Sequence, residues 1–141
     1  MEDKQCVLLD IKGSRHCDGD GETVDFTVEG TLLWDNGKCI LEYDDEHSGE
    51  DGCHTEIVVE EDLVSMRRTG DSNTDMYFKP QTPYSSCFNT PFGALDLTVM
   101  PTLVKTKMGQ QSGNIELEYI LSIAGSQIVN KLQLSYKTTA F

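Results

Sequence analysis

The chain has 141 residues, which is the length of one domain with its own apolar core, and we expect a single domain over residues 1–141. Its 24 acidic residues outnumber 11 basic ones, and the formal net charge of -13 makes nucleic acid an unexpected partner. The apolar runs are far shorter than the roughly 18 residues of a transmembrane helix, so no membrane partner is expected. The five cysteines form no CxxC pair and no apolar leader follows MEDKQ, so we expect a cytoplasmic protein with free thiols.

Alternation of apolar and polar residues with a period of two predicts β-strands along most of the chain. The clearest strand runs from Val24 to Trp34 and ends at DNGK, where Asn36 and Gly37 favour a tight hairpin. The same alternation predicts eight further strands, around residues 7–11, 39–43, 55–59, 64–66, 76–78, 95–99, 115–123 and 128–136. Short polar turns separate these strands, which predicts an all-β, antiparallel up-and-down meander closed into a barrel of about eight to ten strands.

The segment 81–92, QTPYSSCFNTPF, interrupts the alternation. Its prolines at 83 and 91 cannot donate to a ladder, so the sequence predicts a crossing loop or a short helical turn. Such a loop would cap one mouth of the barrel and expose Cys87. Cys39 and Cys53 share the parity of apolar neighbours and are expected to be inert core thiols.

The stretch HCDGDGE, residues 16–22, combines a histidine, a thiol and three carboxylates. Asp18, Asp20, Glu22 and Glu29 match positions 1, 3, 5 and 12 of a calcium loop, but Thr23 stands where that loop needs glycine. A β-strand also follows in place of the required helix. We therefore expect a hairpin turn with no metal and no other cofactor.

Several segments resemble the YwiB-like family, which comprises small bacterial β-barrels without assigned chemistry. These segments are TPFGALDL (90–97), RTG (68–70), DEH (45–47) and the closing strands GNIELEYIL and LQLSY. The resemblance spans nearly the whole chain and implies a calycin-like, lipocalin-resembling barrel. The family's recurring pattern falls on positions that we interpret as associated with the fold: Glu46, Arg68, Gly70, Thr90, Phe92, Gly93 and Tyr119.

Arg68 is a charged residue on a strand face that is otherwise predicted to be apolar. Val64 and Met66 occupy that face, and Arg68 follows with the same parity, which predicts a guanidinium at or inside the barrel mouth. A buried guanidinium needs acceptors for its donors, and it pairs best with a planar anion. The alternation indicates these partners: Asp45, Glu46 if a bulge shifts the register, Tyr43, Tyr119, Asn130 and Tyr136.

Three hypotheses follow. In the first, the barrel binds a small, partly apolar anionic molecule without catalysis, with Arg68 as the anchor and a wall formed by Phe26, Trp34, Met66, Phe78 and Phe92. In the second, the Arg68 cluster is an internal network in a filled barrel, which forms a homodimer or binds a protein partner through segment 81–92 or an outer patch. That patch comprises Leu33, Ile40, Val58 and Ile120. The third and least favoured is an enzyme with Glu46 or Asp45 as the base; no catalytic motif supports it.

Overall fold

The computed structural model describes residues 4–17, 20–45, 53–61, 63–69, 74–90, 92–123 and 125–139. Within these ranges the chain forms β-strands and no helix, so no helix there is a candidate to cross a membrane. The ten strands are β1 (Lys4–Cys17), β2 (Asp20–Asp35), β3 (Lys38–Asp45), β4 (Cys53–Val59), β5 (Val64–Thr69), β6 (Thr74–Phe78), β7 (Tyr84–Thr90), β8 (Gly93–Met108), β9 (Ser112–Ile123) and β10 (Ser126–Thr138).

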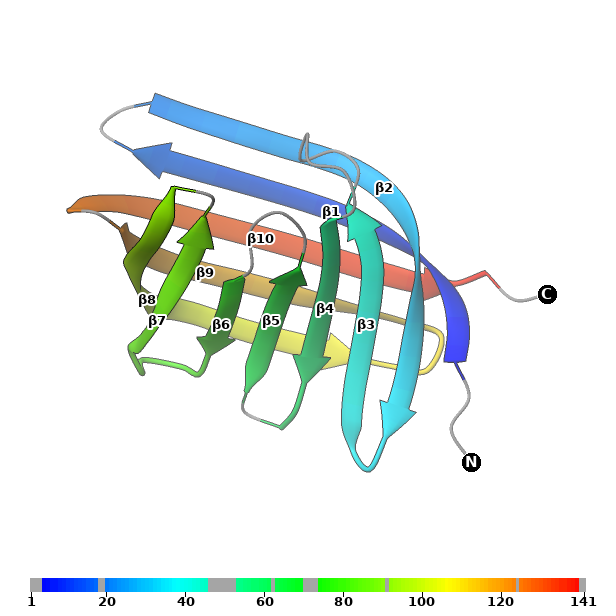
Figure 1. Ribbon diagram of the computed structural model, residues 1–141. Helices are drawn as coiled ribbons and strands as arrows, with labels where there is room; N and C mark the ends of the chain where they lie inside the picture. Colours follow the sequence, from blue (N-terminus) through cyan, green and yellow to red (C-terminus); the bar gives the residue numbers. More distant parts are fainter. Residues whose placement is uncertain are drawn as a thin grey trace.

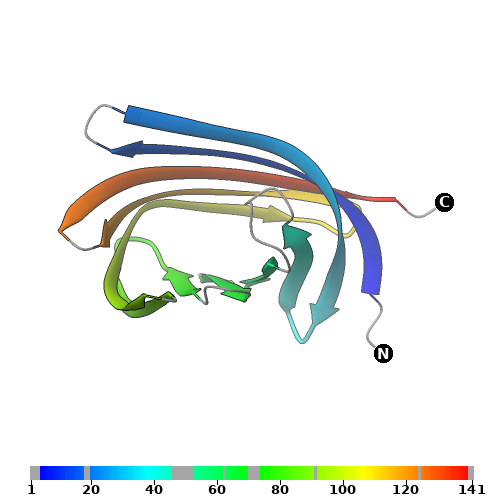
Figure 2. The ribbon, with the colours of Figure 1, turned by 45° about the horizontal axis from the view of Figure 1, so that its top comes forward.

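The strands form one sheet in the order β6-β5-β4-β3-β2-β1-β10-β9-β8-β7. Every neighbouring pair is antiparallel, and β1 joins β10 so that the first and last strands lie side by side. The long strands make one layer that faces the shorter ones, and β2 and β8 curve from one layer into the other (Figures 1 and 2). The edge strands β6 and β7 meet through Tyr77 and Tyr84, whose ring centroids are 4.7 Å apart. The predicted all-β barrel is thus confirmed as a nearly closed one.

The segment 81–92 corrects the sequence prediction, because most of it is strand β7 and not a crossing loop. The prolines at 83 and 91 stand on either side of the strand, so neither removes a donor from within its ladder with β8. Strand β8 is also longer than the predicted strand around residues 95–99. It continues past Pro101 with a register shift between Pro101 and Leu103. A bulge of this kind accommodates proline inside a long strand.

The inner face of the barrel carries the apolar core, as the period of two predicts. Alternate residues on β1, β3 and β9 are buried, among them Leu9, Leu41 and Leu117. Phe78 on β6 is fully buried, and its ring centroid lies 4.8 Å from that of Tyr119 on β9. This aromatic contact connects the short-strand layer to the long-strand layer.

The described cysteines are free thiols in two settings. Cys39 lies in the core, as predicted, and burial raises the pKa of its thiol to about 12. Cys87 is exposed, as expected, although it lies on a strand and not in a loop. The side chain of Cys53 lies outside the described part of the chain.

The candidate site on the inner face of the barrel

Arg68 lies near the end of β5, opposite Thr55 on β4 and Thr74 on β6. Val64 and Met66, which share its parity, are buried in the core, so Arg68 belongs to the inner face. Its side chain is half-buried. Arg68 thus continues the inward-facing row of β5 beyond Val64 and Met66 and is less buried than either of them.

Thr55 is the most unusual residue beside Arg68. It has no exposed surface, and its Oγ1 has no hydrogen-bond partner among the residues described. Its direct cross-strand neighbours are Tyr43 on one side and Arg68 on the other, so all three share the inner face. A buried hydroxyl without a partner costs about 1 to 3 kcal/mol, which makes it a candidate contact for a bound molecule.

A second polar row crosses the opposite layer of the barrel. Arg15 on β1, Asn130 on β10 and Tyr119 on β9 are successive cross-strand partners and share the inner face. Asn130 is buried, and its side-chain Nδ2 donates to the carbonyl oxygen of Ile128 over 3.1 Å. Burial raises the pKa of the Tyr119 phenol, while the positive charges of Arg15 and Arg68 act to lower it. The phenol thus lies within the electrostatic reach of an arginine from each layer.

Tyr136, which was predicted to contact Arg68, lies elsewhere. The hydroxyl of Tyr136 donates to the carbonyl oxygen of Gly109 over 2.6 Å and accepts from the Gly109 N–H over 3.1 Å. Tyr136 follows Asn130 by six positions on β10, a separation of roughly 20 Å along a strand. It therefore fixes the β8–β9 turn and does not join Arg68.

Only some of the residues predicted to form an aromatic wall pack against the core. Phe26 and Trp34 pack against the core, and the Trp34 indole Nε1 is buried without a partner in the described structure. Trp34 pairs with Cys39, four positions before Tyr43 on β3, so it lies away from the Arg68 row. Phe92 is fully exposed and does not line the interior. The side chain of Asp45 and all of Glu46 and Gly70 lie outside the described residues.

The stretch HCDGDGE spans the β1–β2 hairpin, in which Cys17 pairs with Asp20. This pairing confirms the predicted hairpin; Asp18 and Gly19 lie outside the described part of the chain. Across the ranges that the structure describes, no three histidine, cysteine or acidic side chains gather as potential metal ligands.

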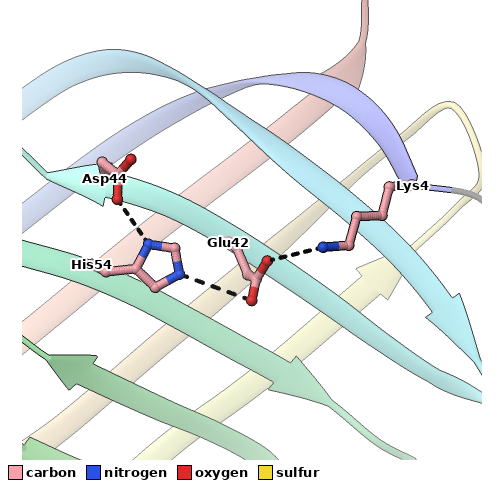
Figure 3. Close-up of polar contacts among 4 residues, drawn as sticks. All are labelled: Lys4, Glu42, Asp44 and His54. Atoms are coloured by element: carbon pink, nitrogen blue, oxygen red, sulfur yellow. Dashed lines mark hydrogen bonds and ion pairs between the residues drawn. The ribbon is translucent and has the colours of Figure 1, made fainter.

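A separate charged cluster occupies the outer face of β3 and β4 (Figure 3). His54 Nδ1 lies 2.8 Å from Asp44 Oδ1, and His54 Nε2 lies 3.8 Å from Glu42 Oε1. Glu42 also reaches Lys4, with 3.8 Å between Oε2 and Nζ. The hydrogen bond with Asp44 raises the pKa of His54, partial burial lowers it, and the charges of Asp44 and Glu42 raise it further. The cluster points away from the barrel interior and forms a surface ion-pair network.

This cluster gives a pH-dependent prediction. Because the folded-state pKa of His54 is raised, its stabilisation is fully present below the unfolded pKa of about 6.5 and is lost as pH rises through the folded value. His54→Gln should lower the free energy of unfolding by less than about 1 kcal/mol at pH values near 5.5, since the pair is solvent-exposed. Urea denaturation at that pH and near pH 9 checks this; an equal loss at both pH values would contradict it.

Two open depressions lie mainly on the outer face of the long strands. One has a volume of about 600 Å³ and is lined by Asp10, Thr27 and Ser135 among others, and the second, of about 480 Å³, by Lys12, Asp25 and Glu116 among others. Their walls mix acidic and basic side chains. Neither includes Arg68, Thr55 or Tyr119, so neither coincides with the polar rows of the inner face.

The fold and the inner polar cluster define a small, antiparallel, nearly closed β-barrel with a largely apolar inner face that carries two polar rows among the described residues. The chain belongs to the family described as a domain of unknown function (DUF1934), whose profile matches residues 9–135. It is similar to the ywiB protein from Bacillus subtilis, known from a crystal structure, with a TM-score of 0.86 and 22% sequence identity. That match covers 97% of this chain and 94% of the other, and it shows the shared fold. No curated protein matches the chain.

Proposed function

We propose that this barrel binds a small, partly apolar anionic molecule on its inner face, in the cytoplasm and without catalysis. The observation that carries the proposal is the fully buried Thr55 hydroxyl, which has no partner among the described residues and lies beside Arg68. A ligand oxygen at this point would accept from Thr55 Oγ1 and would pair with the guanidinium.

The surroundings support both parts of the proposed ligand chemistry. The core residues next to the polar rows, such as Met66, Met76 and Phe78, are apolar and suit an apolar body. The net charge of -13 gives the overall surface little attraction for an anion. The inward-facing Arg68 provides a local positive charge that suits an anionic group. The free thiols support a reducing compartment.

Native mass spectrometry of protein purified without chelators, compared with its denatured mass, tests this proposal. We expect a non-covalent organic adduct on the wild type and its loss in Arg68→Gln. Arg67→Gln is the matched control, because Arg67 is exposed on the same strand and its Nε donates to Asp75 over 2.9 Å. A bare wild-type mass, or an adduct that survives Arg68→Gln, would contradict the role of Arg68.

The alternative function is association through the outer face, as a homodimer or with a protein partner. Leu33, Ile40 and Val58 are successive cross-strand partners on β2, β3 and β4, and all three are half-exposed. They form an apolar row, whereas Ile120 lies apart from them on β9. The same native spectra distinguish the two functions, because a ligand-free dimer would favour association over the binding barrel.

A further inference from the structure

Gln5 on β1 and Trp34 on β2 carry two buried polar atoms of opposite hydrogen-bonding character. The side-chain Oε1 of Gln5 is an acceptor and the indole Nε1–H of Trp34 is a donor, and neither atom has a partner among the described residues. Folded proteins leave few buried polar atoms without a partner, because each one loses its hydration for no return. The two atoms therefore point to a small polar group that serves both of them.

The register of β1 with β2 brings the two side chains together. Gln5 lies directly opposite Leu32, which is fully buried, and Trp34 follows Leu32 by two positions on β2. All three side chains thus share the inner face, and Gln5 and Trp34 are diagonal neighbours across the ladder. Diagonal neighbours in an antiparallel pair lie about 7 to 8 Å apart, a separation that a long amide and an indole can span with one small molecule between them.

We infer that a water molecule binds on the inner face between these two residues, where it accepts from Trp34 Nε1 and donates to Gln5 Oε1. Water is the smallest group that accepts and donates at once, so a single molecule satisfies both atoms. Internal waters in proteins are held in this way by two to four polar groups that the fold leaves without protein partners. The site is independent of the proposed ligand at Arg68.

The surroundings of the two atoms favour a neutral molecule over an ion. Val7, two positions after Gln5 on β1, is fully buried, and Cys39, the direct partner of Trp34 on β3, is buried as well. Burial raises the pKa of the Cys39 thiol to about 12, so it stays uncharged at physiological pH. Its sulfur can serve only as a weak further acceptor for the second hydrogen of the water.

Nuclear magnetic resonance tests the inference, because Trp34 is the only tryptophan and gives a single indole N–H signal. We expect a nuclear Overhauser peak between the indole proton and a water that stays bound for longer than the protein takes to tumble. Gln5→Leu should remove this peak and lower the folding equilibrium constant at least about fivefold, since the buried indole donor then has no acceptor. Gln127→Leu is the matched control, because Gln127 is exposed on β10; it should keep the peak and change the constant less than about threefold.

The sign of the stability change distinguishes the bound water from a site that stays dry. In a dry site, Gln5→Leu removes an oxygen that has no partner, which would raise the folding equilibrium constant. Such a gain, a water peak that survives Gln5→Leu, or a wild-type indole proton without a water peak would each overturn the inference. If Gln5→Leu does not fold, the wild-type peak decides alone. None of these results affects the proposed binding at Arg68, which native mass spectrometry tests separately.

Discussion

Gly30→Ala should lower the free energy of unfolding by about 2 to 3 kcal/mol. A Cβ at Gly30 would lie 2.5 Å from the carbonyl oxygen of Glu42 and 2.7 Å from Leu9 Cδ1. The carbonyl belongs to the β3 backbone and cannot move away without disturbing the β2–β3 ladder. Because Gly30 is the direct partner of Tyr43, this close approach also sets the position of the row that continues through Thr55 to Arg68.

Gly13→Ala on β1 is the matched control for this prediction. A Cβ there would lie 3.7 Å from the Lys131 carbonyl oxygen and 4.0 Å from Leu132 Cδ1, which are ordinary contacts. We expect a change of less than about 0.5 kcal/mol, or a small gain, because alanine restricts the unfolded chain more than glycine does. Urea denaturation of both variants measures the difference. Equal losses of unfolding free energy in Gly30→Ala and Gly13→Ala would contradict a specific cost of the close approach at Gly30.

Thr55→Val should raise the free energy of unfolding by about 1 to 2 kcal/mol while it weakens ligand binding. Valine has nearly the shape of threonine, so the substitution removes the buried hydroxyl without opening a cavity. Removal of a polar atom that has no partner relieves the cost of its desolvation. An opposite change in stability and binding is the signature of a residue that serves a ligand at the expense of the fold.

Thr55→Ser provides the complementary variant, because it keeps the hydroxyl and removes a buried methyl group. It should lose stability by about 1 kcal/mol and retain the non-covalent adduct expected on the wild type. Urea denaturation and native mass spectrometry of the two variants give both quantities. A loss of stability in Thr55→Val would mean that the hydroxyl is satisfied inside the folded protein and would remove it from the proposed site.

The strands could be predicted from the sequence wherever one face is apolar. Val24 to Trp34 and 115–123 keep this alternation over most of their length, apart from Leu33 and Ile120, and both are strands. The β7 strand, YSSCFNT, could not be predicted in this way, because it lies at an edge of the sheet and has few apolar residues to show a period. The continuation of β8 was missed because Pro101 looks like a strand end, although a bulge accommodates it.

The residues of the candidate site were also predicted only in part. Parity indicates that Arg68 lies on the inner face. Parity does not show which residues lie at the same level along the barrel axis, so Tyr136 was grouped with side chains that lie far from it. Thr55 was missed because threonine is common in strands, and only burial without a partner distinguishes it. Arg15 had a usable signal, since Val7, Leu9 and Ile11 continue with the same parity through Gly13 to Arg15.

A crystal structure of the protein purified from cells, with no ligand added, would test the binding barrel most directly. It should show a non-protein molecule on the inner face, with an oxygen within hydrogen-bond distance of Thr55 Oγ1 and an anionic group at the Arg68 guanidinium. An inner face that holds no such molecule, with protein side chains packed against Thr55 Oγ1, would contradict this function. That result would favour a filled barrel acting through its outer face.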